Sequence, residues 1–143
     1  MTSYQVVGRR PLVLRVQAAT LFELFEDAAY AVFDQEWRLS EMPATYSRPV
    51  IAAGDTPAQL LAAWLEELIA MSRAEHLVPC FFVVDRLEEG GVQGSASGLP
   101  VGEASRRSTA PVELRPHVGD PVAVPEGWWV DITMSPPPPL RAV

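Results

Sequence analysis

The stretch from Thr56 to Ser72 constrains the fold of this chain more than any other. It reads TPAQLLAAWLEELIAMS, with apolar residues at the i, i+3, i+4 and i+7 spacing of a helix that buries one face. Thr56 is placed to cap this helix, and Pro57 suits its first turn because no N–H is needed there. Glu66 and Glu67 interrupt the apolar stripe and mark the solvent side. The sequence therefore predicts a core helix with a polar back.

A second amphipathic helix is expected from Thr20 to about Phe33, again with a capping box at its start. Strand patterns occupy residues 4–16, 47–53, 79–87, 92–99, 112–117, 122–124 and 128–134. Gly90 and Gly91 predict a hairpin. The small residues of 92–99 indicate an edge strand or a site of close backbone approach. Helices early and strands late favour an α+β fold, with two amphipathic helices packed on a mixed or antiparallel β-sheet.

Two stretches lack a clear helix or strand pattern. Asp34 to Tyr46 reads as a long loop, which we expect to be flexible or covered by a partner. Pro136 to Pro139 is a polyproline tail that cannot donate ladder hydrogen bonds. Because 143 residues is a single-domain length, we expect one domain over residues 1–135 and a proline-rich tail over residues 136–143.

Charge and composition narrow the classes of function. The formal net charge is −7, which makes RNA an unfavourable direct ligand over most of the surface. All eleven basic residues are arginines, so a catalytic or phosphate-binding lysine is excluded. No apolar run is long enough for a membrane span, and the N-terminus lacks a signal-peptide pattern. One cysteine, Cys80, cannot form an internal disulfide. We expect a cytoplasmic protein.

The motifs indicate no enzyme. The sequence contains no glycine-rich nucleotide-binding motif, nucleophile elbow or zinc motif. His76 and His117 lie far apart, and no carboxylates stand at metal-ligand spacing around either. Cys80 is expected to be a buried, unreactive thiol. Trp128 and Trp129 alternate across a strand, so one ring should face the core and the other solvent. We expect no catalytic residue, no metal and no cofactor.

The order of these segments resembles the archease family over nearly the whole chain. The residues LRVQAATLFELFEDAAYAVFD are similar to the family's first strand and LFENAA helix. The residues RPVIAAGDTPAQLLAAWLEELIAMS are similar to its next strand and its helix with a WLNELL pattern. His117 stands ten residues before Gly127-Trp128, which is similar to the family's TYH…GW. The resemblance implies the archease fold.

The resemblance also implies a metal site, from which this chain departs. The family holds a divalent ion with two aspartates, whose positions here are Pro11 and Ser135. Gly8 stands where the family has a histidine, and a shifted register could offer Asp131 instead. Hard divalent cations need several anionic or carbonyl oxygens in one place. Proline supplies no side-chain oxygen and serine only a neutral hydroxyl, so we expect the metal site to be lost.

What the resemblance implies about function is assistance to an RNA ligase of tRNA splicing, whose guanylylation and turnover the family promotes. With the metal site degraded, we expect a non-catalytic accessory protein that binds a protein partner, with an RNA ligase as the candidate. A cluster of arginines without acidic neighbours near the N-terminus is either a solvated strand edge or a docking patch for an acidic partner. The residues expected to contact a partner are Arg9, Arg10, Arg15, His117 and the loop Asp34 to Tyr46.

An alternative of a different class is a small-molecule or protein-binding domain on the same fold, unrelated to RNA ligation. It would need an apolar pocket beside Trp64, Trp128 and Trp129. The sequence indicates neither the partner's identity nor the oligomeric state.

Overall fold

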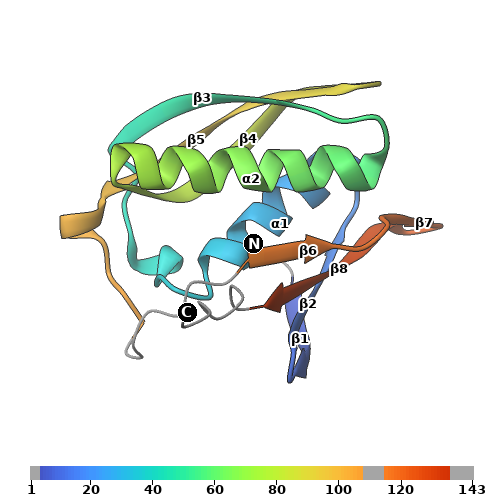
Figure 1. Ribbon diagram of the computed structural model, residues 1–143, viewed down its shortest axis with the longest axis horizontal. Coiled ribbons are helices and arrows are strands. Elements are labelled where there is room, and N and C mark those ends of the chain that lie inside the picture. The colour runs from blue at the N-terminus through green and yellow to red at the C-terminus, as the bar shows by residue number, and fades with distance from the viewer. Residues whose placement is uncertain (1–3, 108–114, 136–143) are drawn as a thin grey trace, which may run out of the picture.

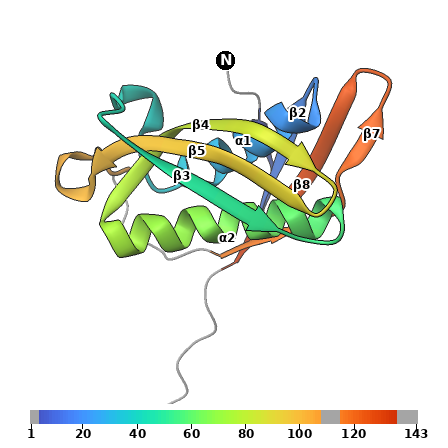
Figure 2. The same ribbon diagram turned by 90° about the horizontal axis from the view of Figure 1, so that it is seen from above.

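The computed structural model describes residues 4–107 and 115–135, which form two antiparallel sheets and two long helices. In chain order the elements are β1 (Tyr4–Arg9), β2 (Leu12–Ala18), α1 (Leu21–Phe33), η1 (Leu39–Glu41), β3 (Tyr46–Ala53), α2 (Pro57–Glu75), β4 (Leu77–Glu88), β5 (Gly91–Pro100), η2 (Val101–Glu103), β6 (Arg115–Val118), β7 (Val122–Val124) and β8 (Gly127–Ser135). Both helices contact strands of both sheets (Figures 1 and 2). The α+β prediction is confirmed, and every strand pair is antiparallel.

Both helices begin where the sequence predicted. The Thr20 and Thr56 hydroxyls accept hydrogen bonds of 3.1 Å from the backbone N–H groups of Glu23 and Gln59, which satisfies donors that a helix start leaves free. α2 ends at His76, whose φ of 53° is left-handed. These caps explain why the helix boundaries are readable from the sequence.

The five-stranded sheet is built from the two ends of the described chain. Its strand order is β1-β2-β8-β6, with β7 pairing to the other part of β8. β2 and β8 run opposite each other from Leu12–Met134 to Ala18–Trp128. Alternate residues of these two strands are fully buried against the helices: Leu14, Val16, Val130 and Ile132. The remaining alternate residues face away from the helices, and we call this side the outer face.

The strand expected at residues 4–16 is a hairpin instead. β1 and β2 pair with each other from Tyr4–Val16 to Arg9–Leu12. The chain turns at Arg10-Pro11, a cis peptide. An arginine-proline turn carries none of the Asn-Gly or Gly-Gly pairs that mark hairpins in a sequence. The single-strand prediction is therefore wrong, and the N-terminal arginines lie at and beside a turn.

The three-stranded sheet has the order β3-β5-β4, so residues 92–99 form a central strand and the edge prediction is wrong. The prediction of close backbone approach is confirmed. A Cβ on Gly94 would lie 2.1 Å from the Val83 carbonyl oxygen and 3.1 Å from Cη2 of Trp64. The Trp64 side chain is fully buried, and its Nε1 donates a 3.1 Å hydrogen bond to the Phe25 carbonyl. β5 therefore provides the glycine surface on which the central tryptophan of α2 rests.

The segment 34–46 is buried at three apolar residues and exposed at Arg38, Ser40, Glu41 and residues 43–46. The buried residues are Trp37, which is 6% exposed, Leu39, 2%, and Met42, 9%. The guanidinium of Arg106 lies 4.3 Å from the centre of the Trp37 ring and donates a 2.6 Å hydrogen bond to Glu36. The expectation that this segment is flexible or covered by a partner stays a prediction; residues 105–107, about 70 positions further along the chain, lie against its first part.

The expected tail at residues 136–143 and the first part of the strand expected at 112–117 lie outside the described residues. In the part of the chain that is described, no helix has the length and apolar character to cross a membrane.

Candidate functional site

The outer face of the five-stranded sheet presents polar and aromatic side chains in rows across β2, β8 and their neighbours. The paired rows are Val13–Thr133–His117, Arg15–Asp131 and Gln17–Trp129–Val122. A sheet with one face packed and one face solvated normally alternates apolar and polar residues in this way. The two ends of this face differ in chemistry.

Arg15 lies in the middle of the outer face and is already paired. Its Nε and Nη2 donate to the two carboxylate oxygens of Asp131 at 2.8 and 2.9 Å. Its guanidinium also lies 4.6 Å from the centre of the Trp129 ring. The hydrogen bond from Arg15 lowers the pKa of the Asp131 carboxyl and raises the pKa of Arg15 itself. The charge of Arg15 is therefore compensated within the protein.

Arg9 ends β1 and Arg10 lies in the β1–β2 turn, at the same end of the sheet as the end of β8 and the start of β6. Arg9 pairs with Leu12, which shares the helix-facing side of β2, whereas Arg115 and His117 lie on the outer face of β6. Strand register places Leu12 opposite Met134, and Arg115 opposite Ser135. His117 Nε2 lies 2.8 Å from the Ser135 hydroxyl oxygen. All three arginines and His117 are exposed. We call this group, Arg9, Arg10, Arg115 and His117, the basic end.

Within the described residues, Arg9, Arg10 and Arg115 form no ion pair. Of the four partner-binding candidates from the sequence, the structure thus brings Arg9, Arg10 and His117 to one end of the sheet and places Arg15 apart from them. Arg115 was missed. Its position two residues before His117 on a strand, which puts both on the same face, was the available signal.

The residues at the family's metal position do not fit a divalent cation. Pro11 precedes Leu12, and Ser135 follows its partner Met134 at the same end of the sheet, so the structure brings the two positions together. The only side-chain oxygen they offer is the Ser135 hydroxyl, which is engaged with His117. Asp131 lies further along β8 with both oxygens held by Arg15.

Acidic and histidine side chains elsewhere supply no substitute, because no group of three His, Cys, Asp or Glu suited to a metal occurs in the described segments. A hard cation would instead meet the positive charges of the basic end, which oppose its binding. The basic end is therefore a surface that attracts anions.

A partly buried polar cluster joins β1 to the end of α1. The Tyr4 hydroxyl donates a 2.5 Å hydrogen bond to Asp34, and Nη2 of Arg107 donates to the same carboxylate at 2.9 Å. Burial, followed by the hydrogen bond to Asp34, raises the pKa of Tyr4 to about 12. Because each group is paired, the cluster fastens segments together and offers no free acid or base.

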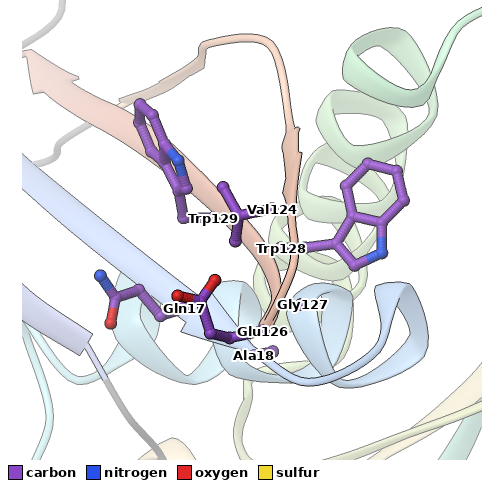
Figure 3. A pocket seen from close by; sticks show the side chains of 7 residues that line it. All are labelled: Gln17, Ala18, Val124, Glu126, Gly127, Trp128 and Trp129. Carbon is purple, nitrogen blue, oxygen red and sulfur yellow. The ribbon is translucent and has the colours of Figure 1, made fainter.

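A pocket lies at the opposite end of β8 from the basic end, beside the β7–β8 hairpin (Figure 3). Its volume is about 500 Å³, and it is lined by Gln17, Ala18, Val124, Glu126, Gly127, Trp128 and Trp129. Trp128 and Trp129 point to opposite sides of β8, and Trp128 packs partly against the core. This confirms the predicted alternation of the two rings. The alternative function would need an apolar pocket beside three tryptophans. This pocket lies beside two of them and is also lined by Glu126 and Gln17, whereas Trp64 is buried inside the core.

The sequence and fold of this chain are similar to those of known proteins. A family model described as the Archease protein family (MTH1598/TM1083) matches residues 12–113. The chain belongs to the archease family. The matched segment begins just after Pro11 and ends before Ser135, so both positions implied for the metal lie outside it.

The archease fold is also found in a solved structure. The chain is similar to the solution structure of Methanobacterium thermoautotrophicum protein 1598, with a TM-score of 0.71. The similarity covers 95% of this chain and 99% of that chain at 20% sequence identity, and it shows a shared fold. No curated protein matches the chain.

Proposed function

We propose that this archease is a non-catalytic accessory protein that binds an RNA ligase of tRNA splicing through its basic end and needs no metal ion of its own to do so. The family supports the ligase as partner. The observation that carries the proposal is the basic end itself. Three exposed arginines without ion pairs in the described part of the chain lie at the same end of the five-stranded sheet, in a protein of net charge −7.

Charge argues for an acidic protein surface as the target of the basic end. Guanidinium groups stay protonated at all physiological pH values and form paired hydrogen bonds with carboxylates. The family resemblance implies a metal cation at this place, and in this chain arginines supply positive charge there instead. A fixed charge of this kind would act independently of divalent ions. The negative charge of the remaining surface disfavours direct binding of RNA.

The proposal is tested by measuring binding to the 3′-phosphate RNA ligase encoded in the same genome. The double variant Arg9→Glu, Arg10→Glu should weaken binding by about tenfold or more, because charge opposition at an interface costs more than loss of a charge. The matched control is Arg73→Glu, Arg86→Glu, which changes net charge equally at exposed positions of α2 and β4, away from the basic end. This control should bind like the unmodified protein.

Two results would reject different parts of the proposal. Absence of binding by the unmodified protein would reject the ligase as partner. Equal weakening by the two double variants would reject the basic end as the contact surface. Binding to the basic end should also weaken as salt rises, since the arginines are exposed to solvent.

A further inference from the structure

The pocket beside the β7–β8 hairpin has the chemistry of a cation site. Glu126 is the only charged residue among its lining residues, and no basic side chain lines it. The Trp129 indole adds an aromatic surface, and Gln17 adds an amide oxygen. An aromatic face together with a carboxylate attracts a guanidinium or ammonium group.

The Trp129 indole already contacts a guanidinium group within the protein. The guanidinium of Arg15 lies 4.6 Å from the Trp129 ring centre while it pairs with the Asp131 carboxylate. The same combination recurs elsewhere in the fold, where an arginine lies 4.3 Å from the Trp37 ring centre and donates to Glu36. The pocket adds a second carboxylate, that of Glu126, near this same Trp129 indole, and no arginine of the described chain lines it.

We propose that this pocket binds an arginine side chain of a protein partner. A volume of about 500 Å³ lies in the range of ligand sites and has room for a guanidinium and its alkyl stem. Val124 supplies an apolar wall for that stem. A divalent metal ion is disfavoured because one carboxylate and one amide are too few oxygen ligands.

The pocket and the basic end lie at opposite ends of β8. The strand runs from Gly127 to Ser135, which corresponds to about 26 Å at the usual rise per residue. The sheet is therefore acidic and aromatic at one end and basic at the other. A partner with the complementary charges would be held in a single orientation. The arginine pocket itself does not depend on the identity of that partner or on the proposed role in RNA ligation.

The test uses N-acetyl-arginine amide and N-acetyl-citrulline amide as probes, because citrulline has nearly the same shape and no charge. The ¹H–¹⁵N signals of the Trp129 indole and the Gln17 side-chain amide are followed during titration of the full chain. Arginine should shift both signals saturably, and citrulline should bind at least about fivefold more weakly. Equal affinity for the two probes, or no saturable shift with arginine, would overturn the proposal.

A pair of variants identifies the carboxylate responsible. Glu126→Gln should weaken arginine binding by about tenfold and leave citrulline binding unchanged, because it removes charge at constant shape. Glu66→Gln, on the exposed side of α2, is the matched control and should bind arginine normally. Arginine binding that survives Glu126→Gln unchanged would contradict the assignment of the pocket. The remaining ¹H–¹⁵N signals of each variant report whether the fold is intact.

Discussion

Gly94 is the position at which the packing of α2 on the three-stranded sheet leaves least room. It lies in the central strand β5, opposite Val50 of β3 and Val84 of β4. An alanine Cβ here would meet the Val83 carbonyl oxygen at 2.1 Å and Trp64 at 3.1 Å. Neither neighbour can yield easily, since one is backbone in a sheet and the other is a fully buried ring.

The expected cost of Gly94→Ala follows from that geometry. An ordinary contact between the two atoms requires β4 and β5 to separate by about 1 Å, which strains the hydrogen-bonded ladder. Overpacking in a well-packed interior typically costs 1–3 kcal/mol and sometimes more. Because both the sheet and the tryptophan are affected, we expect a loss of about 3 kcal/mol in the free energy of unfolding. For a chain of this size the melting temperature should fall by roughly 10 °C.

Gly91 provides a matched control in the same strand. A Cβ there would have only one neighbouring atom, the Ala52 carbonyl oxygen at 3.9 Å. Gly91→Ala should therefore be neutral or stabilise the protein by up to about 0.5 kcal/mol, through the lower entropy of the unfolded chain. Urea unfolding followed by tryptophan fluorescence measures both variants. The packing argument would be refuted if Gly94→Ala lost no more than about 0.5 kcal/mol relative to Gly91→Ala.

Millimolar Ca²⁺ or Mn²⁺ should leave the melting temperature unchanged, whereas a site of micromolar affinity would add about 4 kcal/mol by mass action; a clear rise would contradict the loss of the metal site. Since the pKa of Tyr4 is raised from its usual 10.0 to about 12 in the folded state, its phenol ionises first in the unfolded chain. The free energy of unfolding should therefore fall from about pH 10 to about pH 12, and Tyr4→Phe should remove that part of the fall. A double-mutant cycle on Arg15→Met and Asp131→Asn should give a coupling of about 0.5–1 kcal/mol, because both side chains are one-third exposed; a coupling near zero would show that their pairing adds no stability.

The elements that the sequence revealed are those with local signals. Thr20 and Thr56 mark helix starts because a cap acts within one turn. Gly90 marks the β4–β5 hairpin because its φ of 86° suits glycine. The N-terminal hairpin was missed because its turn at Arg10-Pro11 has no such residue.

The candidate site was harder to predict from the sequence, because its side chains pair with residues far away in the chain. Arg9 and Arg10 were identified as an unbalanced cluster of charge. The compensation of Arg15 by Asp131, which lies 116 residues away, leaves no trace in the neighbouring sequence. The same applies to the burial of Trp37 by a segment far along the chain. The pocket beside Trp129 arises only when the β7–β8 hairpin is placed against the end of β2.

The pairing of β2 with β8 has a consequence for how this protein is made. Arg15 and Asp131 face each other across this pair, although 116 residues separate them. At ribosomal rates of about 5–20 residues per second, roughly 6–23 seconds pass between the synthesis of β2 and that of its neighbour. Throughout that interval the edge of β2 that pairs with β8 has no partner strand. By contrast, residues 46–100 contain the whole of the other sheet and α2, and can assemble while the chain is still growing.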